Sequence, residues 1–292
     1  MKIPVRSVLA LRKASTAVAT SETVAPAALS SEFFDHIRHQ VYGDSKKVDK
    51  VIVTVPTTKD DKLSVLVNRN VSTGYHCFNH VSKQFADEAV LVEVIPTVGS
   101  AYFGSVNQPL QDQAEIQRIT FESPDHVTMA NEAYWRSCSF VTAAILKESL
   151  STEIDCRFPG GSIQKGYFSV NVKGLDGMIF TPEELNTINR LGQKFIRDEK
   201  PLEVVAVPKE IAEENGIYGD SLLRIGRHVF STTGPVIRST RQIGRFSIFR
   251  SIPSKRGDVL VGGVSVPYSQ PTSSYSWSLI AKNAIQKFSK PV

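Results

Sequence analysis

One amphipathic stretch constrains the fold more than any other part of the chain: residues 131–150, NEAYWRSCSFVTAAILKESL. Large side chains recur in it at spacings of four, three and four residues, as in a helix with one face in a core. That stripe consists of Tyr134, Cys138, Val141 and Ile145. The adjoining face carries Ala133, Arg136, Ser137 and Phe140. We therefore predict a long helix here, around which the rest of the chain is organised.

The size and composition of the chain limit its class. A length of 292 residues is enough for two domains plus tails, and 41% hydrophobic residues can supply a core. No apolar run approaches the ~18–20 residues of a membrane span, so we expect none. Cys77, Cys138 and Cys156 lie far apart and form no CxxC pair. This odd, scattered set argues against a disulfide framework or a cysteine zinc site and indicates a reducing compartment.

Charge is distributed unevenly along the chain, whose net charge is +5. Residues 221–292 contain eleven Lys or Arg against the single Asp258, which gives +10. Residues 1–21 contain four cations and no acid, which gives +4, so residues 22–220 carry −9. A basic C-terminal third suggests a polyanionic partner, although a solvated basic face has the same composition.

The N-terminal residues are predicted to lie outside the two domains. Residues 1–21 are basic, free of acid and rich in Ser, Thr and Ala, which is typical of a mitochondrial import presequence; a disordered basic tail is the alternative. Residues 22–47 are predicted to be a helical extension. Its expected buried stripe, behind the possible caps Ser30 and Ser31, consists of Leu29, Phe33, Ile37 and Val41.

Residues 48–122 predict a small α+β unit. Val-rich strands are expected at 48–55 and 62–68, a helix that opens at Thr73, and further strands at 89–95 and 114–122. A turn-rich excursion is expected between the last two. Two strands, a helix and more strands is the order of a ubiquitin-like roll. His76 and His80 lie four residues apart on the helix, but no suitable third ligand is near, so we expect a structural or surface role.

Residues 123–272 predict a second domain, which begins at a hinge and continues into the central helix. Thr181-Pro182-Glu183-Glu184 is a strong helix start, with a cap, Pro at the first position and a capping box. A short helix is expected to stop at Asn215-Gly216. Strands are expected at 166–174, 202–208, 222–231, 242–250 and 258–266. Residues 273–292 are predicted to form a C-terminal helix and tail, which completes an α+β fold.

Several stretches resemble a known family. VNRNVSTGYHCFNHVSKQFADEAVLVEV resembles a TGS domain, the ubiquitin-like module at the start of threonyl-tRNA synthetases. EAYWRSCSF, GYFSVNV, TPEELNTI, KEIAEENG and STTGPVIRST resemble the second domain of that synthetase, which edits mischarged serine. The closer resemblance is to the mitochondrial large-subunit ribosomal proteins related to threonyl-tRNA synthetase, carried by VNRNVSTGYHC, NEAYWRSC and the RIG…GPVIR stretch. It covers roughly residues 30–275.

The resemblance also implies a loss of chemistry. The editing family carries a His-x-x-x-His pair on the central helix and a later Cys-x-Gly-Pro-His cluster, which can hold a metal or move protons. The matching positions here are Arg136 and Phe140 on the helix, then Thr232 and Val236. Arg cannot accept a proton near neutral pH, and Phe and Val have no ligand atom. Gly234-Pro235 remains, as a turn would require. We therefore expect no catalytic residue, metal or cofactor.

The function implied by the resemblance is structural. We expect a constituent of the large subunit of the mitochondrial ribosome, in the matrix, which contacts ribosomal RNA and neighbouring ribosomal proteins and supports translation. Among the basic residues, Phe230, Phe246 and Phe249 are expected to be core rather than platforms for bases. The cations expected to meet phosphate are Arg224, Arg227, Arg238, Arg241, Arg245, Arg250, Lys255 and Arg256.

Two alternatives remain open at this point. A free-standing deacylase that clears seryl-tRNA would need a surviving catalytic group, for which Lys147 and Glu148 are the nearest candidates, although both are expected to be surface charges. An RNA-binding module outside the ribosome would show a salt-dependent affinity for RNA without association with ribosomes.

Overall fold

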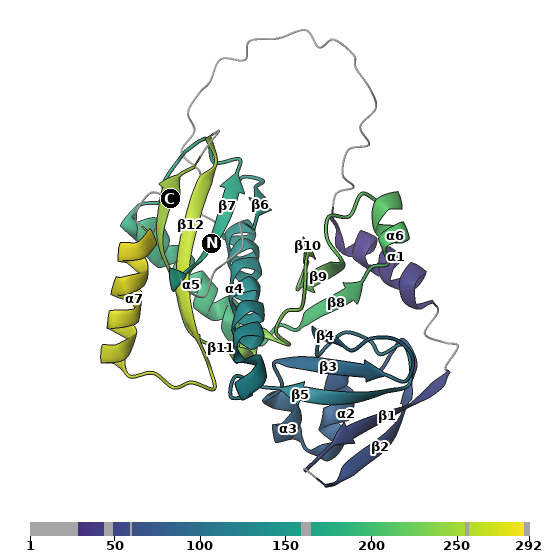
Figure 1. Ribbon diagram of the computed structural model, residues 1–292. Helices are drawn as coiled ribbons and strands as arrows, with labels where there is room; N and C mark the ends of the chain where they lie inside the picture. The colour runs from purple at the N-terminus through teal and green to yellow at the C-terminus, as the bar shows by residue number, and fades with distance from the viewer. Residues whose placement is uncertain (1–28, 44–48, 59, 159–164, 255–256, 289–292) are drawn as a thin grey trace, which may run out of the picture.

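The computed structural model describes residues 29–43, 49–58, 60–158, 165–254 and 257–288. The predicted presequence, Lys255 and Arg256 lie outside these ranges. Three sheets and the helices packed on them organise the described residues, which confirms the predicted α+β class (Figure 1).

The first unit is a five-stranded sheet that carries two short helices. Its strand order is β2-β1-β5-β3-β4, in which β1 and β5 are parallel and the other neighbours antiparallel. The elements, in chain order, are β1 (Lys50–Pro56), β2 (Lys62–Asn68), α2 (Gly74–Val81), α3 (Lys83–Asp87), β3 (Leu91–Pro96), β4 (Tyr102–Ser105) and β5 (Ala114–Ile119). This is the order predicted from the sequence with two differences. The single helix that was expected is divided into α2 and α3, and the turn-rich excursion contains a further strand, β4.

Local hydrogen bonds explain the two helices of this unit. The hydroxyl of Thr73 accepts from the backbone N–H of His76, and the Nδ1 atom of His76 accepts from the N–H of Thr73 at 3.1 Å, which forms a capping box. His76 therefore has a structural role, as expected. Ser82 is extended and its hydroxyl accepts from Phe85 N–H at 3.0 Å, so it ends α2 and starts α3.

The second unit is built around α4 (Val127–Ser149), which follows a short 3-10 turn, η1 (Pro124–His126). Figure 1 shows α4 between a four-stranded sheet and a three-stranded sheet. Their orders are β11-β12-β7-β6 and β10-β9-β8. The strands are β6 (Asp155–Arg157), β7 (Phe168–Lys173), β8 (Leu202–Ala206), β9 (Ser221–Ile225), β10 (His228–Thr232), β11 (Ile243–Pro253) and β12 (Val259–Pro267). The further helices are α5 (Pro182–Arg197), α6 (Lys209–Glu214), η3 (Thr240–Gln242) and α7 (Ser274–Phe288).

Two strand predictions in this unit were incomplete. Residues 222–231 were expected to be one strand, but they form the hairpin of β9 and β10, with Ile225 opposite His228. Gly226 adopts φ +60° in the turn, a conformation that favours glycine. The short strand β6 was not predicted, because Asp155, Cys156 and Arg157 lack an alternating apolar pattern.

Helix α5 begins as predicted and closes the free edge of a sheet. Thr181 and Glu184 form its capping box. The side-chain amide of Asn189 donates to the carbonyl of Ile248 at 2.7 Å and accepts from its N–H at 2.8 Å. Gln193 donates to the carbonyl of Phe246 at 3.0 Å. Backbone groups of β11, the edge strand, are therefore satisfied by α5.

The N-terminal helix α1 (Ser31–Tyr42) packs on the three-stranded sheet with a face that includes the predicted Phe33, Ile37 and Val41. Ser30 caps it as expected. Phe34, Ile37 and Tyr42 are its buried residues, whereas Leu29 is 39% exposed. Leu29 precedes the helix, which begins at Ser31, and is therefore not part of its buried face. No described helix is long and apolar enough to cross a bilayer.

The two units share a core and several hydrogen bonds. Buried residues Leu91 and Ile119 belong to the same apolar cluster as α4. Asn107 Nδ2 donates to the carbonyls of Leu202 and Arg238 at 3.0 and 2.8 Å, and Gln242 Nε2 donates to the carbonyl of Ala89 at 2.8 Å. These contacts join residues up to 153 positions apart, so the units pack as one body.

Candidate functional site

The structure brings the four positions named from the resemblance into one region. Arg136 and Phe140 lie one turn apart on α4. Thr232 ends β10, and Val236 follows in the next segment. The Nη1 atom of Arg136 donates to the carbonyl of Pro235 at 2.5 Å. The Phe140 ring lies 5.5 Å from that of Phe230, on β10. We call this region, between α4 and residues 219–237, the α4 site.

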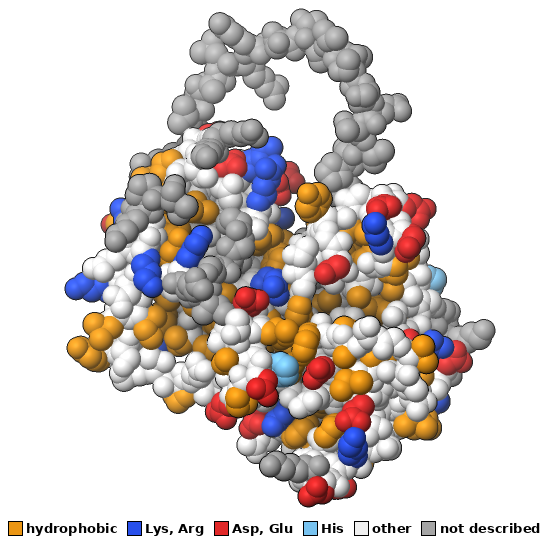
Figure 2. Space-filling view, viewed as in Figure 1, with side chains coloured by type: hydrophobic (Ala, Val, Ile, Leu, Met, Phe, Trp, Pro, Cys, Tyr) orange, Lys and Arg blue, Asp and Glu red, His pale blue; other side chains and the backbone are white. Residues whose placement is uncertain are grey.

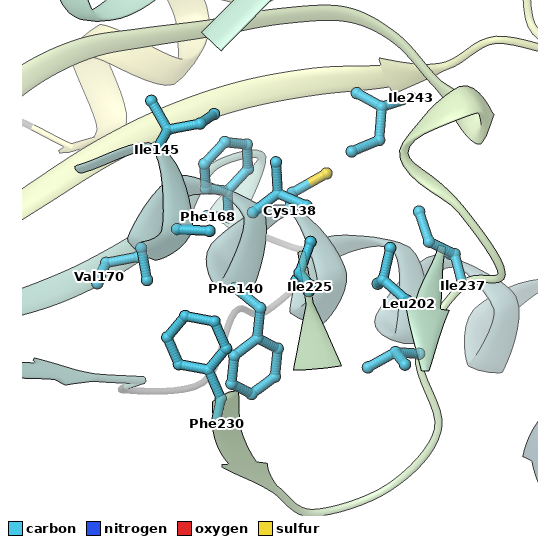
Figure 3. Close-up of a cluster of buried hydrophobic side chains, with 14 of the residues drawn as sticks. Cys138, Phe140, Ile145, Phe168, Val170, Leu202, Ile225, Phe230, Ile237 and Ile243 are labelled. Atoms are coloured by element: carbon cyan, nitrogen blue, oxygen red, sulfur yellow. The ribbon is translucent and has the colours of Figure 1, made fainter. Parts of the chain in front are cut away.

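Aromatic rings fill the inner part of the α4 site. The Phe140 ring centroid lies 4.1 Å from that of Phe158, and Phe158 lies 5.8 Å from Phe230 in an edge-to-face contact. Figure 3 shows Phe140 and Phe230 side by side, with Phe168 and Val170 nearby. Phe140, Phe168 and Phe230 are almost fully buried. The ring at position 140 therefore supplies packing, and the expectation that Phe230 and Phe246 are core residues is confirmed.

Arg136 occupies the outer part of the α4 site as a fixed cation. Burial lowers the pKa of its guanidinium, and the nearby charges of Glu132 and Asp220 oppose that effect. Its hydrogen bond to the carbonyl of Pro235 satisfies one of the N–H donors of the guanidinium, a group that has no acceptor atom. The group can hold the turn and attract an anion, but it cannot act as a general base.

Two glycines allow the loops of the α4 site to approach one another. Gly234 has φ +84°, and its N–H lies 3.2 Å from both carboxylate oxygens of Asp220. A Cβ atom there would lie 3.3 Å from Arg136 Nη1. Gly219 has φ +114°, and a Cβ there would lie 2.4 Å from the carbonyl oxygen of Thr232. Both positions therefore need glycine for backbone conformation and for space.

Short polar side chains tie α4 to the segment that follows Pro235. The hydroxyl of Ser137 accepts from Ile237 N–H at 2.9 Å and donates to the carbonyl of Ala133 at 2.6 Å. The hydroxyl of Ser105, in the first unit, accepts from Val236 N–H at 2.8 Å. The Thr232 hydroxyl is buried without a hydrogen-bond partner among the described residues. Sequence reasoning missed Ser105 and Ser137, because their partners lie 131 and 100 residues away.

The two candidate groups for the deacylase alternative are half-buried rather than surface charges. Lys147 Nζ lies 5.4 Å from the centroid of Phe230. Glu148 Oε1 lies 3.3 Å from Nε2 of His228. Burial lowers the pKa of His228, and Glu148 opposes that effect. Burial also raises the pKa of the nearby Cys156 thiol to about 12, which leaves it protonated and weakly nucleophilic near neutral pH.

Metal binding requires a cluster of ligands. Within the described ranges, no group of three or more His, Cys, Asp or Glu side chains lies close enough to hold an ion. In the α4 site, the positions of the expected ligands are taken by guanidinium, benzyl, hydroxyl and isopropyl groups. Neither the benzyl nor the isopropyl group can bind a metal.

The structure divides the predicted phosphate-binding cations into two groups. Arg224 lies between Glu203 (2.6 Å) and Asp35 (2.8 Å) and over the ring of Phe34. Arg238 pairs with Asp87 at 3.0 Å and lies over Tyr75. Both side chains join elements of the fold. The side chains of Arg227, Arg241 and Arg250 lie at exposed positions, and that of Arg245 at a half-exposed one.

A groove of about 230 Å³ lies elsewhere, where α1, the first unit and β8 meet. Apolar and charged side chains both line it. Among them are Phe34, Arg38, Tyr75, His76, Asn107 and Glu203. The groove is separate from the α4 site, and His76 in its wall already bonds to Thr73.

Comparison with known proteins gives two informative matches, while no protein-family model matches the chain. Large ribosomal subunit protein mL39 of Drosophila melanogaster is 25% identical over 224 residues, which cover 68% of this chain and 64% of that protein. Probable threonine–tRNA ligase 1, cytoplasmic, of Dictyostelium discoideum is 22% identical over 223 residues, which cover 70% of this chain and 29% of the ligase.

The chain therefore spans slightly less than two thirds of the first relative and less than one third of the second. These matches confirm the resemblance that VNRNVSTGYHC, NEAYWRSC and the GPVIR stretch predicted. The chain is similar to a large-subunit ribosomal protein and, more distantly, to a threonine–tRNA ligase.

Proposed function

We propose that this chain is a structural constituent of the large subunit of the mitochondrial ribosome, where it supports translation in the matrix. The observation that carries the proposal is the similarity to ribosomal protein mL39 over 68% of the chain. The first unit serves as a TGS-like domain over residues 48–122 and the second as an editing-like domain over residues 123–272. Residues 273–292 add a C-terminal helix and tail, and residues 22–47 a helical extension.

The contents of the α4 site support a role without catalysis. A reaction at an ester would need a base, a nucleophile or a metal-bound water. Arg136 and Phe140 offer none of these, and the side chain of Phe140 fills the space with packed rings. The site acts instead as the structural joint between α4 and β10.

Contact with ribosomal RNA is assigned to the cations that the fold leaves at its surface. A Lys or Arg side chain can bind phosphate most readily where doing so does not break an ion pair inside the fold. Arg224 and Arg238 do not meet this condition, because their largely buried side chains pair with Glu203, Asp35 and Asp87. Arg241 pairs with Glu199 at 3.5 Å, but both side chains of that pair are exposed. Residues 1–21 act as the import presequence in this proposal. Lys255 and Arg256 remain candidate cations of this proposal and lie outside the described residues. The exposed candidates are Arg227, Arg241, Arg245 and Arg250.

Gradient sedimentation tests the proposal. An epitope-tagged chain, expressed in cells, is followed through a sucrose gradient of mitochondrial lysate at low Mg²⁺, so that the two ribosomal subunits separate. We expect the tag in the large-subunit fractions. A tag that stays among free proteins at the top of the gradient would contradict the proposal.

Two controls make this result specific. A tagged chain without residues 1–21 should remain outside mitochondria, which tests the presequence separately. Purified chain should leave Ser-tRNA(Thr) intact. Hydrolysis that is abolished by Arg136→Ala or Cys138→Ala would instead support the deacylase alternative.

A further inference from the structure

Helix α7 has an exposed stripe that packing does not explain. Only Ala284 and Phe288 of its 15 residues are buried. Tyr275 is 74% exposed and Leu279 44% exposed, and the exposed Lys282 follows on the same side at helical spacing. An isolated exposed apolar residue needs no explanation, but an aromatic, an aliphatic and a cationic side chain aligned on one face form a surface with a defined chemistry.

Arg245 lies between the start of α7 and the last part of β12, and a second exposed tyrosine follows that strand. Its guanidinium donates to the hydroxyl of Ser274, at the start of α7, at 3.3 Å, and its backbone carbonyl accepts from the hydroxyl of Ser265, on β12, at 2.8 Å. Tyr268, directly after β12, is 71% exposed. We call this surface the tyrosine face, and it consists of Arg245, Tyr268, Tyr275, Leu279 and Lys282.

The helix and strands around Arg245 and Tyr275 carry basic but no acidic side chains. α7 and the two strands on which it packs, β11 and β12, contain Lys and Arg but no Asp or Glu. Figure 2 shows Lys and Arg side chains over the α7 side of the molecule, whereas most of the visible Asp and Glu lie over α6 and the five-stranded unit. A polyanion is therefore the partner whose charge complements this face.

We propose that the tyrosine face binds unpaired nucleotides of RNA: Tyr268 and Tyr275 stack on bases, and Arg245 and Lys282 contact the flanking phosphates. An aromatic ring can stack on a base only where that base is free of a duplex, because the bases inside an A-form helix stack on one another and their faces are closed to side chains. The inference rests on the proposed ribosomal function and names the part of the RNA that the chain recognises.

The test measures binding of the purified full chain to two RNA probes. One is an unstructured oligouridylate of about 12 nucleotides and the other is an RNA duplex of similar length. We expect the single strand to bind more tightly. Tyr268→Ala and Tyr275→Ala should each weaken single-strand binding about tenfold, and duplex binding should stay within about twofold. Tyr268→Phe and Tyr275→Phe should retain the affinity, because the ring remains.

Tyr218→Ala is the matched control, since Tyr218 is 91% exposed and lies in the loop before β9, away from α7. Alanine variants at 268 and 275 that bind the single strand as tightly as Tyr218→Ala would overturn the inference. So would cross-links from positions 268 and 275 to protein alone in purified large subunits. The two proposals can fail separately. If the wild-type chain does not sediment with the large subunit but the alanine variants at 268 and 275 still lose single-strand binding, the proposed function is contradicted and the inference stands.

Discussion

The helices α4 and α7 are built from similar residues, but α4 is largely buried and α7 is largely exposed. Both combine Ala and Ser with a Tyr, a Trp and one or two further large side chains per turn. In α4, 14 of 23 residues are buried, whereas in α7 only 2 of 15 are. The difference lies in their surroundings, because α4 has a sheet on each side and α7 covers the outer side of one. A periodic stripe thus identifies a helix, but it does not show how many of its faces are covered.

The strongest test of this contrast removes a large side chain from each helix. Phe140→Ala should lower the free energy of unfolding by about 3–5 kcal/mol, because it opens a cavity between Phe158 and Phe230. Leu279→Ala, on the exposed side of α7, should stay within about 0.5 kcal/mol. Urea unfolding followed by the fluorescence of the two tryptophans, Trp135 and Trp277, measures both. Equal losses in the two variants would break the comparison.

A second test concerns the loops that hold the α4 site closed. Gly219→Ala should cost about 3 kcal/mol, because its Cβ would lie 2.4 Å from the carbonyl oxygen of Thr232. Gly216→Ala, also at positive φ but with open space around it, should cost about 1 kcal/mol. Thermal unfolding distinguishes the two. If Gly216→Ala lowers the free energy of unfolding more than Gly219→Ala does, the close packing of Gly219 against Thr232 does not stabilise the α4 site.

A third test compares one serine from each helix. Ser137→Ala leaves the buried N–H of Ile237 without its acceptor and should cost about 1–3 kcal/mol. The hydroxyl of Ser278 on α7 is exposed and bonds only to the carbonyl of Tyr275 among the described residues, so Ser278→Ala should stay within about 0.5 kcal/mol. Denaturant midpoints give the comparison, and similar values would argue that the Ser137 bridge adds nothing.

The smallest expected effect is a pH dependence that arises at the C-terminal end of α4. Burial lowers the pKa of His228 in the folded chain below the value of about 6.5 expected after unfolding. The unfolded state then binds more protons, so stability should fall, by up to about 1 kcal/mol, as the pH drops below about 6.5. His228→Gln should flatten that part of the profile. α7 contains no His, Asp or Glu and should add nothing.

Sequence patterns predicted most of the elements, because caps and periodicity are local. Thr73, Thr181 and Ser30 all cap helices where expected. The hairpin of β9 and β10 was missed, because residues 222–231 were interpreted as one strand and the turn at Gly226 was not recognised. The core-facing side of α1 was predicted in part: Phe33, Ile37 and Val41 pack on the core as expected, but the buried Phe34 and Tyr42 were missed.

The candidate site was predictable only in part. The resemblance identified Arg136, Phe140, Thr232 and Val236, but packing around them depends on Phe158, Gly219 and Ser137, whose partners are distant in the sequence. Charge patterning was similarly limited. Arg224 and Arg238 lie in an acid-poor stretch, and only folding brings Glu203, Asp35 and Asp87 to them. Whether the exposed arginines contact RNA stays a prediction.

The amide caps on β11 restrict how this molecule can assemble with others. A sheet edge usually offers a template for β-augmentation, in which a foreign strand joins through its main chain regardless of its side chains. Asn189 and Gln193 already occupy backbone groups of Ile248 and Phe246. A neighbour at this edge must therefore recognise side chains, which makes docking there sequence-selective and discourages fibre-like self-association.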